Sequence, residues 1–347
     1  MRVQFLGAAS VLIESTYARI LCDPWFVGPT YYGAWRQDPP LDHQALLKEL
    51  GDITAIWISH RHPDHMHLPT LERIHAPILS MAEGVLQHRD VRVERFKVDD
   101  TDSIGVFTDD RGHCVINMND VTREQFDNAQ VELPSPNILL SSYTGAGPWP
   151  QCFWHEKGNL AEICEGREAR FKNDALHVIG TVAPYQWIPI AGEYALRGSL
   201  ASLNSWRGSP PRETTKHWTP CANPIPRGAW SDEASKRHAW VDLYDYTEKL
   251  DHEKLPFPDI DALARRVKAQ LRPYKDWRIV FGFAGRSVSV GNGPHWHRFD
   301  VDPRQLELML SGRQTFENVL ISSSMFMIVE GPFDRGLYRH LRGICRS

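Results

Sequence analysis

One short segment constrains the fold of this chain more than any other. Residues 53–58 are apolar and predict a buried strand, which ends at Ser59. The side chains that follow within six positions are His60, His62, Asp64 and His65. Imidazole and carboxylate groups at the end of a strand predict a metal site, and together they suit zinc or iron better than calcium or magnesium.

The spacing of these residues also indicates how they divide between metal positions. A turn that leaves a strand can aim alternate side chains at one point, so His60 and His62 can share one metal. Asp64 and His65, at the start of the next helix, face a second position. The alternative is four polar residues in a solvated loop, but three histidines and an aspartate in six positions are far from average usage.

The pattern His-x-His-x-Asp-His resembles the signature of the metallo-β-lactamase superfamily. This resemblance implies an α/β fold, a four-layer αββα sandwich, with a site for one or two metals at the edges of the sheets. It also implies that Asp120, at the end of a strand, bridges the metals. Asp23, which follows a strand and precedes a proline, would brace the site from behind the ligands, although a plain turn residue is the alternative.

Several other stretches are similar to the CMP-N-acetylneuraminic acid hydroxylase branch of this superfamily. They are residues 21–29, 59–71, 112–120 and 189–194, with weaker likeness over 301–310 and 331–338. The likeness therefore extends over most of the chain. That hydroxylase also carries a Rieske iron-sulfur module, which needs Cys-x-His pairs, and this sequence has none. An oxidative reaction here would draw electrons from a separate donor or from the substrate.

Two further departures affect the predicted ligand set. Where the resemblance leads us to expect a histidine in the middle of the domain, the sequence has Asp99, with Asp100 beside it. Either Asp99 is an oxygen ligand that shifts the site toward iron or manganese, or the position binds nothing and one metal is lost. The last histidine of the superfamily is replaced near Glu193, which is either a carboxylate ligand or an exposed side chain.

The pattern along the chain predicts alternating strands and helices up to about residue 203. We expect strands at 2–6, 10–14, 18–22, 78–81, 91–98, 103–108, 113–118, 138–141 and 177–190, and helices at 41–50, 68–75, after residue 81, and at 156–176. Residues 26–40, rich in glycine, proline and aromatic residues, should form an ordered loop over the site.

A second unit is predicted after an irregular, proline-rich segment at 204–236. We therefore divide the chain into a metal-binding catalytic domain, 1–236, and a smaller C-terminal α+β lobe, 237–347, that covers the site and supplies no metal ligand. The lobe should contain helices at 259–272, at 303–310 and from 334, and strands at 277–283, 287–290 and near 318–329. His295 and His297 have a chelating spacing, but we interpret them as surface histidines.

The amino-acid composition indicates a globular protein. The 347 residues are 42% hydrophobic and 24% charged with a formal net charge of −4, which is typical of a globular protein and argues against general binding to nucleic acid or a membrane surface. The N-terminal residues lack the apolar run of a secretory signal, so we expect a cytoplasmic protein. The six cysteines form no Cys-x-x-Cys pair and should be reduced.

These features leave two classes of enzyme. The favoured one is a non-haem iron oxygenase that hydroxylates or otherwise oxidises a polar small molecule at a mono- or dinuclear site, with zinc or manganese as other metals. The alternative is a metal-dependent hydrolase of a phosphoester, ester or amide, in which Asp64 serves as ligand and proton acceptor. A third hypothesis is a binding protein whose metal site has degenerated. The intact His-x-His-x-Asp-His motif argues against it.

Overall fold

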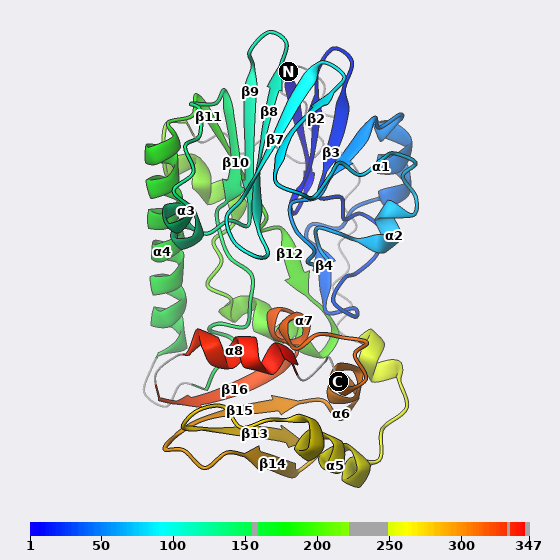
Figure 1. Cartoon of the computed structure of the whole chain (residues 1–347), viewed down its shortest axis with the longest axis vertical. Coiled ribbons are helices and arrows are strands. Elements are labelled where there is room, and N and C mark those ends of the chain that lie inside the picture. Colours follow the sequence, from blue (N-terminus) through cyan, green and yellow to red (C-terminus); the bar gives the residue numbers. More distant parts are fainter. Residues whose placement is uncertain (155–158, 222–248, 332–333, 344–347) are drawn as a thin grey trace.

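The computed structural model describes residues 1–154, 159–221, 249–331 and 334–343. Two sheets face one another in the larger part of the molecule, and a third sheet with its own helices lies at one end (Figure 1). The predicted boundary between residues 236 and 237 lies outside the described residues and stays a prediction.

The first sheet has four strands in the order β1-β2-β3-β5, and only β3 and β5 run parallel. Its strands are β1 (Arg2–Gly7), β2 (Ser10–Glu14), β3 (Arg19–Cys22) and β5 (Ala55–Trp57). The helices α1 (His43–Leu50) and α2 (Leu68–Leu71) belong to this side of the molecule (Figure 1). Helix α1 begins where Asp42 accepts hydrogen bonds from two backbone amides, and its Leu46 and Leu50 pack in a cluster with residues of β1, β2 and β3.

The second sheet has six strands in the order β11-β10-β9-β8-β7-β6, with parallel pairing only between β9, β10 and β11. The strands are β6 (Gly84–His88), β7 (Val91–Lys97), β8 (Ser103–Asp109), β9 (Cys114–Asn119), β10 (Ile138–Ser142) and β11 (Gln186–Ile190). Helices α3 (Arg123–Ala129) and α4 (Leu160–Val182) cover its outer face (Figure 1).

The two sheets bury one continuous apolar layer between them. Phe5 and Ile13 of the first sheet belong to the same cluster as Phe107 and Leu140 of the second, and all four side chains are less than 2% exposed. Together with the outer helices this gives the predicted αββα sandwich. The burial pattern of β7 alternates along its first five residues, as expected for a strand with one face on the core.

A two-stranded ribbon lies between the sandwich and the lobe (Figure 1). It pairs β4 (Trp35–Gln37) with β12 (Tyr194–Leu196), and the turns η1 (Gly198–Trp206), η2 (Arg212–His217) and η3 (Asp251–Lys254) follow in the chain. Trp35 stacks on Tyr194 with ring centroids 3.8 Å apart, which ties the predicted ordered loop 26–40 to the end of the second sheet.

The lobe contains a four-stranded sheet in the order β14-β13-β15-β16. Its elements are α5 (Ile260–Gln270), β13 (Trp277–Phe283), β14 (Arg286–Val290), β15 (His295–Val301), α6 (Pro303–Leu310), α7 (Phe316–Ile321), β16 (Met325–Glu330) and α8 (Arg335–Leu341). A hydrophobic core separate from that of the sandwich holds them together, with Phe281 and Phe299 at 0–1% exposure.

Four predicted elements were wrong in type. The strand expected at 78–81 is not among the described strands, and Ile78 forms only an isolated bridge with Ile56. The helix expected after residue 81 is the edge strand β6, because residues 84–88 pair with β7. Residues 177–182, expected to begin a strand, continue α4, since Val178 and Val182 extend its buried face. Part of the strand region near 318–329 is helix α7. None of the helices in the described ranges combines the length and apolar character needed to cross a membrane.

The interpretation of His297 as a surface residue was also wrong. His297 is fully buried in the lobe, and its ring lies edge-on to Trp277 with centroids 4.8 Å apart. Burial lowers the pKa of His297 to about 4, so the folded lobe holds it as neutral imidazole. His295, two residues earlier on β15, is exposed as expected.

His297 should make the stability of the folded chain depend on pH. Because its pKa is depressed on folding, its contribution is fully present above about pH 6.5 and is lost as the pH falls toward about 4. The free energy of unfolding of the wild type should fall across this window more steeply than that of His297→Phe, by up to about 1.4 kcal/mol per pH unit. Parallel slopes in denaturant titrations of the two proteins would contradict the assignment.

Candidate metal centre

The loop that follows β5 brings the histidines of the motif together. The carbonyl of His62 accepts hydrogen bonds from the amides of His65 and Met66, at 3.0 and 2.8 Å, so the chain makes one tight turn after His62. This turn returns His65 to the side of His60, and the two rings lie 4.0 Å apart, centroid to centroid. Both rings are buried, at 1–2% exposure.

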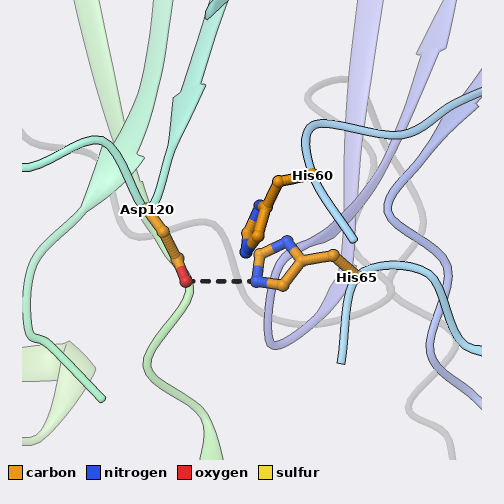
Figure 2. A group of neighbouring side chains, drawn as sticks. All are labelled: His60, His65 and Asp120. Atoms are coloured by element: carbon orange, nitrogen blue, oxygen red, sulfur yellow. Dashed lines mark hydrogen bonds and ion pairs between the residues drawn. The ribbon is translucent and has the colours of Figure 1, made fainter. Parts of the chain in front are cut away.

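Asp120 reaches the same point from the second sheet. It directly follows β9, and its Oδ2 lies 3.1 Å from Nε2 of His65 (Figure 2). The ligand atoms of His60, His65 and Asp120 all lie within 4.8 Å of one another. The predicted cluster is therefore assembled where strands of both sheets end.

The other two residues of the motif adjoin this group. Nδ1 of His62 lies 2.7 Å from Nε2 of His60, and Oδ2 of Asp64 lies 3.4 Å from Nε2 of His65. His60, His62, Asp64, His65 and Asp120 thus form one connected set of donor atoms.

Asp23 contacts the loop that carries the histidines, and its role in bracing a metal site stays a prediction. It is fully buried after β3, and its Oδ1 accepts hydrogen bonds from the amide and the hydroxyl of Ser59 at 2.7 and 3.0 Å. The side-chain amide of Asn119 donates to the other carboxylate oxygen. Asp23 therefore links the loop after β5 to the end of β9.

Ser59 determines which ring nitrogen of His60 and of His65 keeps its lone pair for a metal. Its hydroxyl hydrogen goes to Asp23, so its oxygen can only accept from Nδ1 of His60 at 2.9 Å and from Nδ1 of His65 at 3.3 Å. With hydrogens on both Nδ1 atoms, the Nε2 atoms face the cluster, which is the tautomer that metal binding needs.

Arg95 of β7 fixes the same loop from the second sheet. Its guanidinium donates to the carbonyl oxygens of Ile58 and Ser59, at 2.8 and 3.3 Å, and lies 4.7 Å above the ring of Trp57. The hydroxyl of Ser103 donates to the carbonyl of Ser59 at 2.6 Å. The backbone that carries the histidines is thus hydrogen-bonded to both sheets.

The charges in the cluster favour a cation at its centre. Burial acts to lower the pKa of His65, but the carboxylates of Asp120 and Asp64 outweigh it and raise that pKa well above its usual value. Burial acts to raise the pKa of Asp64, and the charge of His65 overcomes it to hold that pKa well below its ordinary range. Burial and the neighbouring His65 and His62 lower the pKa of His60. A metal ion that binds here replaces the proton of His65.

Tyr31 is a contact that the sequence analysis missed. Its hydroxyl donates a hydrogen bond of 2.7 Å to Oδ1 of Asp64, which leaves Oδ2 facing His65. Tyr31 is 3% exposed and adopts a positive φ of 51° in the loop predicted to cover the site. The only sequence signal for this contact was the glycine- and proline-rich composition of the loop that carries Tyr31.

The structure does not bring Asp99 into the cluster. Its Oδ1 accepts from the amides of Thr101 and Asp102, at 2.7 and 2.8 Å, and its Oδ2 from the side chain of Gln125. These hydrogen bonds form the turn between β7 and β8, where short-range acceptors are favoured. Asp102 is the nearer carboxylate instead, with Oδ1 at 3.5 Å from Nδ1 of His60.

Glu193, the other candidate ligand, is likewise not a member of the group of described residues whose ligand atoms lie within 4.8 Å. It follows β11, where its carbonyl accepts from the amide of Asp38 at 3.2 Å. Burial raises the pKa of Tyr143, and the charge of Glu193 adds to that shift, so the Glu193 carboxylate lies near this tyrosine.

Two clefts flank the cluster and share His62 and Asp102 in their walls. One, of about 290 Å³, has a largely apolar wall that includes Tyr143, Phe171 and Ile321. The other, of about 370 Å³, is lined by charged side chains that include Lys97. The lobe supplies Ile321 to the first cleft and Thr315, Glu317 and Asn318 to the second, and its role as a cover stays a prediction.

Comparison with known proteins shows what this chain is similar to. Residues 2–125 match the profile of the beta-lactamase superfamily domain. A protein of Mycolicibacterium smegmatis named as a candidate Rieske 2Fe-2S iron-sulfur protein is 41% identical over 73 residues, which are 21% of this chain and 14% of that protein. The cytidine monophosphate-N-acetylneuraminic acid hydroxylase of Pongo pygmaeus is 32% identical over 76 residues, 21% of this chain and 12% of the hydroxylase.

The aligned regions thus span less than a sixth of the length of these relatives. Similar solved structures include CmlA, a diiron beta-hydroxylase from Streptomyces venezuelae, at 14% identity and a TM-score of 0.40 over 62% of this chain and 48% of CmlA. They also include an isothiocyanate hydrolase from Delia radicum gut bacteria, at 12% identity and a TM-score of 0.44 over 68% of this chain and 100% of the hydrolase. The sequence matches confirm the resemblance inferred from the motifs.

Ser59→Ala should weaken metal binding without disrupting the fold. The substitution removes the acceptor that holds Nδ1 of His60 and His65, and loss of such a partner typically costs 10- to 100-fold in metal affinity. Competition for Zn²⁺ against a chromophoric chelator measures it. Ser15→Ala is the control, because Ser15 bonds Asp90 instead. Wild-type affinity in a folded Ser59→Ala protein would disprove the role of this hydroxyl.

Asp102 and Asp99 form a matched pair for a second test. Asp102→Asn removes the charge 3.5 Å from His60 and should lower metal affinity about tenfold. Asp99→Asn keeps an oxygen acceptor for the turn and should leave affinity within about twofold of wild type, because Asp99 is bonded to backbone amides. The reverse ranking in the same Zn²⁺ competition would restore Asp99 as the ligand.

Proposed function

We propose that this chain, whose residues 2–125 match the beta-lactamase superfamily domain, is a metal-dependent enzyme that uses non-haem iron to oxidise a polar small molecule. The observation that carries the proposal is the composition of the cluster. Three imidazoles meet two carboxylates, Asp64 and Asp120. Oxygen ligands at this proportion favour a harder ion than zinc, and iron or manganese fits such a set.

The residues present fit one or two metal ions. His60 and His62 would hold one ion through Nε2 and Nδ1, and Asp64 and His65 a second, with Asp120 able to reach either. Bound ferrous iron would supply the activation of dioxygen at coordination positions that the protein leaves open.

The protein's own groups would hold these ligands in place and shape the site for substrate. Tyr31 restricts Asp64 to one free oxygen by bonding the other. The apolar wall of the smaller cleft, with Phe171 and Val178, would exclude water from a bound molecule, while Ser141 and Thr144 in the same cleft offer hydroxyl groups to its polar atoms.

Two relatives found by sequence support the proposal of oxidation. The names of two of them refer to a hydroxylase and to a Rieske iron-sulfur protein. Since this sequence lacks the Cys-x-His pairs of a Rieske centre, we propose that a separate protein or the substrate supplies electrons.

Hydrolysis is the second candidate, because the same cluster of nitrogen and oxygen donors also binds zinc. In that reaction Asp64, hydrogen-bonded to Tyr31 and next to His65, would serve as ligand and proton acceptor for water. The carboxylate-rich cluster ranks this function below oxidation.

The two functions predict opposite outcomes in one experiment. The full chain is prepared anaerobically with Fe²⁺, mixed with oxygen and a reductant, and followed by oxygen uptake and visible absorption. The zinc-loaded chain is assayed with phosphodiester and ester substrates. We expect uptake only in the ferrous protein and none in Asp120→Ala, which should retain less than half of the wild-type metal. Ester turnover by the zinc form beside an inert ferrous form would reverse the ranking.

A further inference from the structure

Helix α7 of the lobe carries a carboxylate to the metal cluster. Oε1 of Glu317 lies 4.0 Å from Nε2 of His62, and both side chains are about three-quarters buried. Glu317 is 252 positions beyond the last histidine of the motif, and no sequence pattern connects the two. Thr315 and Asn318, on either side of it in the chain, line the larger cleft together with His60 and His62.

The position of Glu317 is held by contacts inside the lobe. The hydroxyl of Thr315 caps α7 by accepting from the amide of Asn318 at 3.0 Å. Phe316 and Val319 on the same helix are buried in the lobe's core at 0–1% exposure. Arg342 of the C-terminal segment forms an ion pair with the Glu317 carboxylate. The carboxylate is therefore presented to His62 by a fixed helix.

The two ring nitrogens of His62 have different neighbours. Nδ1 faces Nε2 of His60 at 2.7 Å, on the side where the ligand atoms meet. Nε2 faces Glu317, and an ionised carboxylate accepts hydrogen bonds but donates none. This environment favours hydrogen on Nε2 and leaves the lone pair of Nδ1 for the metal. A movement of about 1 Å in the carboxylate brings it to hydrogen-bond distance.

The other two histidines obtain the same orientation from within their own loop. Ser59 accepts from Nδ1 of His60 and of His65, as described above. For His62, the carboxylate at the outer nitrogen comes from the lobe. Each imidazole thus has a partner for the nitrogen that does not face the cluster.

We propose that Glu317 is a positioning residue for the metal centre: through Nε2 of His62 it selects the tautomer that binds metal, and it makes the lobe part of the site. The proposal rests on the proposed metal-dependent function. The proposal agrees with the expectation that the lobe supplies no direct metal ligand, since Glu317 lies beside His62 and would not touch the metal itself.

Metal affinity of the full chain provides the first test, with Co²⁺ as a spectroscopic probe. Glu317→Ala should bind Co²⁺ 10- to 100-fold more weakly than wild type, which is the usual cost of losing such a partner. Glu317→Gln retains an acceptor oxygen and should recover part of that loss. Glu307→Ala is the matched control, because Glu307 is a carboxylate of the same lobe, paired with Arg266. A folded Glu317→Ala protein with wild-type affinity would overturn the proposal.

The tautomer of His62 provides a second test that needs no variant at position 317. Long-range nitrogen–proton NMR spectra of the Zn²⁺-loaded wild type, in which a metal ion replaces the hydrogen between His60 and His62, should show the His62 hydrogen on Nε2. The signal is assigned by its loss in His62→Gln. A hydrogen on Nδ1 would refute the proposal even if Glu317→Ala fails to fold.

The same Co²⁺ titration separates this proposal from the proposed function. If Asp120→Ala and His62→Gln lose metal while Glu317→Ala does not, only the role of Glu317 fails. If Asp120→Ala and His62→Gln bind Co²⁺ as tightly as wild type, the metal-dependent function itself fails and the role of Glu317 fails with it.

Discussion

The hydrogen bonds accepted by Asp23 hold the whole site together. One buried carboxylate receives the amide and hydroxyl of Ser59 and the side-chain amide of Asn119, so it connects the ends of three strands from two sheets. Burial raises the pKa of Asp23, and His65 and the amide and hydroxyl of Ser59 offset part of that rise. Without this group the loop that carries the histidines and the strand that carries Asp120 would have no common anchor.

Further hydrogen bonds extend from Asp23 to the histidines. Ser59, which is bonded to Asp23, accepts from His60 and His65 and so orients their rings. Arg95 of the second sheet donates to two backbone carbonyls of the same loop. The metal ligands therefore sit on backbone that is bonded on both sides, which suits a site that must keep its geometry through each reaction. His62 stands outside this network, and its outer nitrogen faces the lobe.

The sandwich could be predicted from the sequence because it depends on local signals, and the residues proposed for the central cluster were chosen from signals of the same kind. The apolar strand before Ser59 and the spacing of the four ligands are contiguous, and the strand of Asp120 carries its own apolar pattern. The contributions of Tyr31 and Glu317 could not be predicted, since each depends on contacts between segments far apart in the chain. The sequence left open whether Asp99 is a ligand, because the turn that consumes its oxygens is visible only in three dimensions.

The wrong element types have a similar cause. Residues 177–182 are apolar enough for a strand, and only their continuity with α4 packed on the second sheet makes them helical. Residues 84–88 are mostly exposed, so no apolar pattern marked them as a strand, and pairing with β7 determines their conformation. In both segments, contacts with distant parts of the chain determine the secondary structure, and the local sequence pattern does not.

The order of strands in the second sheet has a consequence for dissecting the protein. The segment that matches the superfamily domain ends at residue 125, yet β9, whose end carries Asp120, pairs on one side with β10, which begins at Ile138. A fragment cut at residue 125 would expose the full length of β9 as an edge, with a row of unbonded amides and carbonyls next to an apolar face. Such edges pair with other chains, so the fragment would aggregate instead of reporting on the site.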